Sequence, residues 1–167
     1  MNRHKDFWQV TEDSLKKSME AYKIETSMRN DLLNLYKVLS PFEEVLETLK
    51  SLKEKKYKLA ILSNGTPELL NHLVSTNNLE NIFDDIFSIE EVKIYKPDSR
   101  VYDLPIKKFK FRKDEIVFLS ANTWDVSGAG NYGFNSIWVN RSNNIFDSLD
   151  FKPNIEIKSL NELLSII

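Results

Sequence analysis

Hydrophobic positions recur at helical spacing through the first forty residues and contain no strand-like run. One stripe comprises Phe7, Val10, Leu15, Met19 and Tyr22. A second stripe comprises Leu32, Leu33, Tyr36 and Leu39. A third helix is predicted to begin at Ser40-Pro41-Phe42-Glu43, which offers an N-cap, a proline at the first helical position and a capping-box glutamate. The pattern therefore predicts a helical N-terminal part and a new helix starting at residue 41.

Short apolar runs then alternate with helical stretches to the end of the chain. The expected strands are residues 57–62, 85–88, 116–119, 136–139 and 155–157. Helices are expected after Thr66, near Asp98, over residues 122–132 and after Ser159, although Pro105 falls inside the second of these. Apolar strands separated by helices are typical of a parallel sheet covered on both faces. The predicted fold class is α/β with a doubly wound parallel sheet.

Composition narrows the classes of function without naming one. The 167 residues contain no cysteine, which excludes disulfides, zinc–thiolate sites and thiol catalysis and favours a reducing, cytoplasmic location. The net charge of −2 gives no electrostatic reason to expect nucleic acid or a membrane surface as a partner. No apolar run approaches the roughly 20 residues that span a bilayer, and no signal peptide is expected at the N-terminus.

Candidate chemistry lies where the predicted strands end, because ligands of open α/β sheets bind beyond the carboxyl ends of the strands. Ser63 and Asn64 follow one strand and lead into a helix N-terminus, which is suited to an anion. A second strand is followed by a loop from Ser120 to Asp125. Between them, Lys96 precedes a proline and could neutralise carboxylates in the crevice. The alternative is that these are ordinary capped loops and a solvated lysine.

Taken together, the three loops resemble the haloacid dehalogenase superfamily, and more narrowly its type II 2-haloacid dehalogenases. The segments that carry the resemblance are Leu62-Ser63-Asn64-Gly65, Tyr95-Lys96-Pro97-Asp98-Ser99-Arg100-Val101-Tyr102 and Ser120-Ala121-Asn122-Thr123-Trp124-Asp125. Residues 1–7, 133–134 and 138–141 also look like stretches of that family. The resemblance implies a Rossmann-like core over residues 40–167, a partial helical cap over residues 1–39 and a homodimer.

The resemblance also implies a role for each candidate residue in removing halide from a small 2-haloalkanoic acid through an aspartyl ester. Ser63 would bind the substrate carboxylate, and Asn64 would hold the leaving halide with Phe7 and Trp124 as apolar walls. Tyr102 would line the pocket. In the catalytic set, Lys96 would pair with the nucleophile, Ser120 and Asn122 would orient it, and Asp125 would position the lysine and the hydrolytic water.

A phosphatase of the same superfamily is the weaker choice. Phosphatases usually carry Gly-Asp ahead of a further aspartate to hold magnesium, whereas this chain reads Ser120-Ala121 and retains only Asp125. One carboxylate beside a lysine is a poor magnesium site. No metal and no cofactor are therefore expected.

The superfamily's first motif, an apolar strand ending in an aspartate with Gly-Thr shortly behind, has no counterpart here. None of the aspartates follows a buried strand in that way, and the family's substrate-contacting arginine is also absent. Three hypotheses follow. The chain is a truncated dehalogenase that is inactive alone, or its start is misplaced and upstream sequence supplies the strand. The third is a non-catalytic protein that binds small anions or accepts a strand from a complete homologue.

Overall fold

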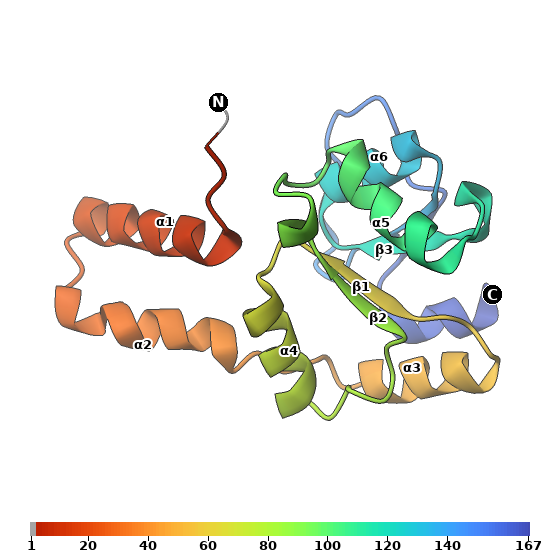
Figure 1. Cartoon of the computed structure of the whole chain (residues 1–167), viewed down its shortest axis with the longest axis horizontal. Coiled ribbons are helices and arrows are strands. Elements are labelled where there is room, and N and C mark those ends of the chain that lie inside the picture. Colours follow the sequence, from red (N-terminus) through yellow and green to blue (C-terminus); the bar gives the residue numbers. More distant parts are fainter. Residues whose placement is uncertain (1–2) are drawn as a thin grey trace.

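The computed structural model describes residues 3–167 and has the expected α/β architecture (Figure 1). The helices are α1 Phe7–Tyr22, α2 Arg29–Asn34, α3 Val45–Glu54, α4 Pro67–Thr76, α5 Ser99–Phe109 and α6 Thr123–Tyr132. The strands are β1 Ala60–Ser63, β2 Asp85–Ser88, β3 Val117–Ser120, β4 Asn135–Val139 and β5 Ile155–Ile157. Short 3₁₀ segments lie between several of these elements, and one, η5 Leu160–Ser165, follows β5. Strands alternating with helices confirm the predicted fold class.

All strand pairs are parallel, but within residues 3–167 the strands form two sheets. One sheet has the order β1-β2 and the other the order β3-β4-β5. The pairing aligns Ser63 with Ser88 in the first sheet and Ser120 with Trp138 in the second. The polar residues that end β1 and β3 are therefore placed by the strand register.

One hydrophobic cluster joins the two sheets. Its buried members are Leu49, Leu52, Val74, Leu79, Ile82, Ile137, Val139, Ile157 and Leu163. Ile61 of β1, Ile86 of β2 and Leu119 of β3 pack against these residues. Because helix α3 and strands of both sheets contribute to the same cluster, burial of apolar surface stabilises both sheets at once.

The N-terminal helical unit, residues 7–37, packs as a hairpin to one side of the strands (Figure 1). Met19 and Leu33 are buried within it. The rings of Trp8 and Tyr36 meet edge to face with centroids 6.4 Å apart, and the Lys37 ammonium lies 5.2 Å from the Trp8 ring. The unit thus has a small apolar interior of its own, and the division into residues 1–39 and 40–167 stays a prediction.

The predicted start of the third helix is wrong. Helix α3 begins at Val45, and residues 41–44 do not continue it toward the N-terminus. The cause lies in contacts distant in sequence. The Glu44 carboxylate pairs with Arg141 and accepts a hydrogen bond from the Leu160 amide, while the Arg141 guanidinium lies 3.9 Å from the Phe42 ring. These contacts fix the chain before Val45 and override the local capping signal.

Helix α5 continues through Pro105 despite the hydrogen bond that a proline cannot donate. Val101, Tyr102, Leu104 and Pro105 are all buried in this helix, so packing offsets the lost hydrogen bond. None of the helices described is long and apolar enough to cross a bilayer.

Candidate active site

The loop after β1 places two polar side chains ahead of helix α4. The Ser63 hydroxyl oxygen accepts a hydrogen bond from the Gly65 amide at 3.0 Å. Thr66 is the N-cap of α4 and accepts from the Leu69 amide at 3.3 Å. The Ser88 hydroxyl, at the end of β2, donates to the Gly65 carbonyl at 2.7 Å. The loop is therefore fixed from both strands of its sheet.

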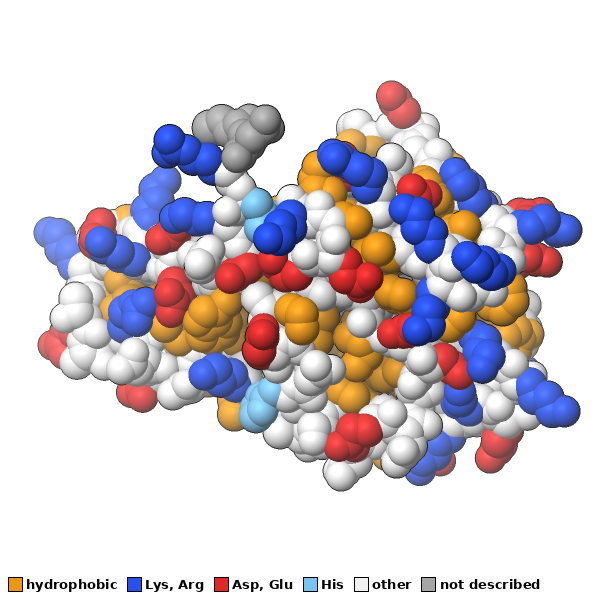
Figure 2. Space-filling model, in the orientation of Figure 1, with side chains coloured by type: hydrophobic (Ala, Val, Ile, Leu, Met, Phe, Trp, Pro, Cys, Tyr) orange, Lys and Arg blue, Asp and Glu red, His pale blue; other side chains and the backbone are white. Residues whose placement is uncertain are grey.

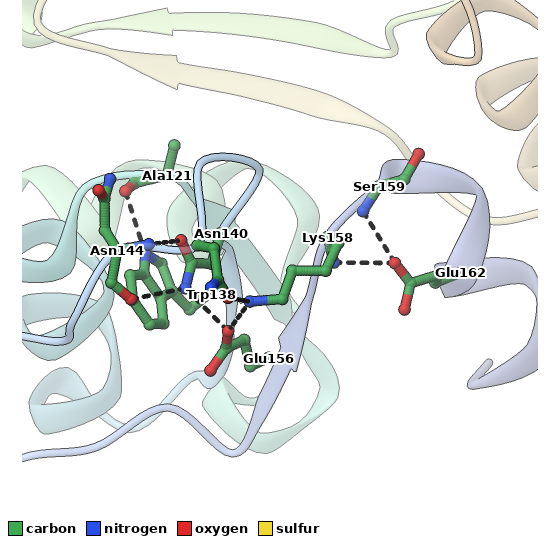
Figure 3. A network of polar contacts seen from close by, with 9 residues as sticks. Ala121, Trp138, Asn140, Asn144, Glu156, Lys158, Ser159 and Glu162 are labelled. Carbon is green, nitrogen blue, oxygen red and sulfur yellow. Dashed lines mark hydrogen bonds and ion pairs between the residues drawn. The ribbon is translucent and has the colours of Figure 1, made fainter.

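The loop after β3 is held in a similar way. The Ser120 hydroxyl oxygen accepts from the Asn122 amide at 3.1 Å, and Asn122 is the N-cap residue of α6 without a capping bond from its side chain. The Trp138 indole donates to the Ala121 carbonyl at 3.1 Å, which ties the loop to β4 (Figure 3). Trp124, in the first turn of α6, is 38% exposed and so can contact a ligand.

Lys96 connects these two loops. Its ammonium donates to the Leu62 carbonyl at the end of β1, at 3.1 Å, and to the Asp125 carboxylate at 2.7 Å. Its backbone amide donates to the Asn64 side-chain oxygen at 3.2 Å. The Lys96 and Asp125 side chains are only 9% and 3% exposed, so this ion pair is largely shielded from water. The structure thus brings Asn64, Lys96 and Asp125 together as one site.

Tyr102 is the second residue, after Lys96, that contacts the Asp125 carboxylate. Its hydroxyl donates to the second Asp125 carboxylate oxygen at 2.9 Å. Burial and the neighbouring Asp125 charge raise the pKa of Tyr102 well above its ordinary value, so the hydroxyl remains a donor. The side chain is fully buried, with 0% exposure, and so cannot line an open pocket. The structure corrects that expectation: Tyr102 holds Asp125 in place.

Phe7 is the one candidate residue that lies in the N-terminal helical unit. It begins α1 and is partly buried. The remaining candidates come from the ends of β1 and β3, the loops that follow them, the first turn of α6, and α5 with the segment before it. The role of Phe7 in a halide pocket stays a prediction.

Two features near the site carried no recognisable signal in the sequence. One is the loop after β4, which contributes Asn143, Asn144, Ile145 and Asp147 to a pocket of about 560 Å³ shared with Asn122 and Trp124. Asn140 holds this loop by exchanging hydrogen bonds with the backbone of Asn144 (Figure 3). The other is Phe118, whose ring lies 5.5 Å from the Lys96 ammonium.

The site contains donors that are oriented but not used. A side-chain oxygen accepts a hydrogen bond from a backbone amide in each of Ser63, Asn64 and Ser120. None of these three side chains donates a hydrogen bond to another group in residues 3–167. Two hydroxyl protons and the Asn64 amide protons remain for a ligand. Within residues 3–167, no group of three His, Asp or Glu side chains is placed so that it could hold a metal ion.

The fold is a parallel α/β fold, and the loops at its strand ends carry unused hydrogen-bond donors. Comparisons with known proteins identify the family. The model of the haloacid dehalogenase-like hydrolases matches residues 3–139. The chain therefore belongs to this family, as its loop motifs indicated.

Individual relatives resemble almost the whole chain. The (S)-2-haloacid dehalogenase of Pseudomonas sp. (strain YL) is 38% identical over 99% of this chain and 72% of that protein. A solved dehalogenase with an intermediate complex superposes with a TM-score of 0.96 at 34% identity, covering 100% of this chain and 75% of that one. The L-2-haloacid dehalogenase from Xanthobacter autotrophicus with chloropropionic acid covalently bound gives 0.88 at 27% identity, covering 99% and 77%.

Proposed function

We propose that this chain carries the substrate site of a dehalogenase that removes halide from small (S)-2-haloalkanoic acids. The observation that supports this most is the set of unused donors on Ser63, Asn64 and Ser120 beside the buried Lys96 ammonium. Donors held in place by backbone amides are arranged for an anion before it binds, which lowers the ordering cost of binding. The names of the similar enzymes supply the substrate class.

Each residue has a role in this proposal. Ser63 donates its hydroxyl proton to the carboxylate of the substrate. Asn64 donates its amide protons to the leaving halide, with Phe7 and Trp124 as apolar walls. Ser120 and Asn122 orient the attacking carboxylate, and Lys96 keeps it ionised. Asp125, held by Tyr102, positions Lys96 and the hydrolytic water.

The reaction needs one group that the motifs of this chain do not provide. A carboxylate oxygen attacks the carbon bearing the halogen, the carbon–halogen bond breaks, and the halide leaves with the electron pair. Water then hydrolyses the ester, giving the 2-hydroxy acid, a proton and the regenerated carboxylate. None of the aspartates of this sequence occupies the family's nucleophile motif. We therefore expect no halide release from 2-chloropropionate by the purified chain alone, and clear turnover would contradict that expectation.

Binding tests the site without catalysis. Calorimetry with lactate and with chloride should show binding to the chain. Ser63→Ala should weaken lactate binding roughly 10- to 150-fold, since hydrogen bonds to charged groups contribute about 1.5–3 kcal/mol. Ser27→Ala, on an exposed serine outside the site, is the matched control. Absence of heat with both ligands would reject the anion site.

Acceptance of a strand is a second function that the sheet topology favours. The Asp84 amide donates to the Leu59 carbonyl and the Asn135 amide to the Ile116 carbonyl. Because alternate residues of a parallel strand face opposite neighbours, Ala60 and Leu62 of β1 turn away from β2, and Val117 and Leu119 of β3 turn away from β4. No strand of residues 3–167 pairs with these two edges. Unpaired edges of this kind bind extended segments of other chains.

The occupant we propose is an apolar strand that runs parallel to β1 and β3 and ends in an aspartate followed by Gly-Thr, supplied by a complete homologue. A synthetic peptide of that kind should raise the melting temperature of the chain and restore halide release from (S)-2-chloropropionate. The same peptide with asparagine at the aspartate should bind without restoring release. A peptide that leaves the melting temperature unchanged would contradict strand acceptance.

Three further expectations belong to the same proposal. Residues 1–39 act as a partial cap on a core of residues 40–167, and the chain works in the cytoplasm, consistent with its lack of cysteine.

The chain also forms a homodimer through the N-terminal helical unit, where Figure 2 shows apolar side chains at the surface. The exposed apolar residues in and just after this unit include Met28, Leu35, Val38, Leu39 and Phe42. Sedimentation should give a dimer for the natural chain and a monomer for Leu39→Lys.

A further inference from the structure

Residues 4–6, here called the strap, lie against the loop that carries Lys96 although about 90 positions separate them in the sequence. The His4 imidazole pairs with the Glu90 carboxylate at 2.8 Å. The Tyr95 hydroxyl donates to the Lys5 carbonyl at 3.0 Å, and the His4 and Tyr95 rings lie 5.8 Å apart. The His4 and Glu90 side chains are 20% and 22% exposed, so the contact is partly shielded from water.

The strap is continuous with α1. Asp6 is the N-cap of that helix and exchanges hydrogen bonds with Gln9: the Gln9 amide donates to the Asp6 carboxylate at 2.8 Å, and the Asp6 amide donates to the Gln9 side chain at 3.3 Å. A capping box of this kind fixes the direction in which the chain enters a helix. A movement of α1 is therefore transmitted to Lys5 and His4.

At its other end the strap reaches the site through Tyr95, whose hydroxyl is bonded to Lys5. Tyr95 directly precedes Lys96, whose amide is bonded to Asn64 and whose ammonium is bonded to Leu62 and Asp125. Burial, with the nearby Glu90 and Asp6 charges, raises the pKa of Tyr95 and keeps its hydroxyl a donor to Lys5. Hydrogen bonds and covalently adjacent residues thus connect α1 to the Lys96 ammonium.

A second tether holds the far end of the N-terminal helical unit. His72 of α4 bonds to the Lys37 carbonyl at 3.1 Å, and the Asn77 side chain donates to the Leu39 carbonyl at 2.9 Å. Both histidines of the chain therefore lie where this unit meets the rest of the molecule. Loss of the strap would free only the end nearest Lys96 and would leave the unit attached.

We propose that the strap couples the position of α1 to that of Lys96, with His4, Glu90 and Tyr95 as positioning residues for the lysine. When the helical unit is seated, the strap holds Tyr95 and thereby keeps the Lys96 loop in the geometry that pairs its ammonium with Asp125. The value of this coupling for catalysis rests on the proposed dehalogenase function. The coupling itself does not depend on that function and can be measured without substrate.

Amide hydrogen exchange tests the coupling directly, because exchange rates report local opening. Tyr95→Phe removes only the hydroxyl bond to Lys5. The loss of one hydrogen bond should speed exchange roughly 3- to 10-fold, both in residues 4–10 and in residues 93–96. Tyr22→Phe is the control, because Tyr22 lies on α1 and is 80% exposed. Exchange in α3 and the melting temperature should match the control.

His4→Ala is the second variant, since His4 lies near the N-terminus and outside the hydrophobic clusters. It should accelerate exchange in the same two segments, and the ¹³Cε resonance of labelled Lys96 should shift in both variants. Faster exchange confined to residues 4–10, with the Lys96 loop and its resonance unchanged, would show that the strap merely rests on the loop and would overturn the proposal. Failure of lactate binding would leave these readouts unaffected.

Discussion

The loops around Lys96 are held by buried hydrogen bonds, whereas the N-terminal helical unit is held mainly by contacts at its two ends. Lys96, Asp125 and Tyr102 are nearly or fully buried, and each is fixed by hydrogen bonds within the core. In the helical unit the buried residues are Thr11, Met19 and Leu33, and it depends on tethers at both ends. The same chemical change should therefore have a large effect in the first region and a small one in the second.

Breaking an ion pair should show the largest difference. Lys96→Met leaves the Asp125 carboxylate buried beside an apolar side chain and should lower the free energy of unfolding by about 3–5 kcal/mol. Arg29→Met removes the exposed pair with Glu12 in the helical unit and should cost no more than about 1 kcal/mol. Urea titrations of both variants measure this. Equal losses would show that the Lys96 pair is as well hydrated as a surface pair.

Removing a tyrosine hydroxyl should give the next largest difference. Tyr102→Phe deletes the donor to Asp125 and should cost about 1.5–3 kcal/mol, because the acceptor is charged and buried. Tyr22→Phe, at an exposed position of α1, should be within about 0.5 kcal/mol of the natural chain. Thermal unfolding followed by circular dichroism compares the two. A neutral Tyr102→Phe would mean that Asp125 does not need this donor.

Acid should weaken the contacts that fix the chain before α3. Although burial raises the pKa of Glu44, hydrogen bonds from its own backbone, Arg141, Leu160 and Ser159 hold the value at about 2, below the ordinary 4.5. A carboxylate with a lowered pKa stabilises the fold above its unfolded pKa, and this contribution is lost as pH falls from about 4.5 toward 2. Glu44→Gln should therefore flatten the dependence of unfolding free energy on pH in that window. An unchanged slope would contradict the role of Glu44.

Removing helix caps should give the smallest effects. Thr66→Ala deletes the buried N-cap of α4 and should cost about 1 kcal/mol of global stability. Asp6→Ala deletes the cap of α1, where we expect faster local exchange in residues 4–10 and a smaller change in the global midpoint. Hydrogen exchange and urea titration together separate local from global opening. A larger global loss for Asp6→Ala would reverse the comparison.

Elements governed by local pattern could be predicted from the sequence. The strands Asp85–Ser88 and Ile155–Ile157 have the predicted bounds. Thr66 caps its helix, and a helix starts next to Asp98, as expected. The loops of the site could be found because polar residues after parallel strands gather at one edge of a sheet. Their catalytic roles stay predictions.

Features made by distant contacts could not be predicted. The start of α3 depends on Glu44 meeting Arg141 and Leu160, about 100 positions away. The burial of Tyr102 follows from helices α5 and α6 packing together, which no local pattern encodes. The strap contact joins the side chains of His4 and Glu90, which are 86 positions apart in the sequence.

The hydrophobic cluster that spans both sheets has a calorimetric consequence. Because α3, β4 and β5 share their buried side chains with Ile61 and Ile86, neither sheet can expose its apolar surface while the other stays intact. Heating should therefore give one endotherm for residues 40–167, with equal calorimetric and van't Hoff enthalpies. The two sheets would then constitute one thermodynamic unit, although no backbone hydrogen bond between strands within residues 3–167 connects them.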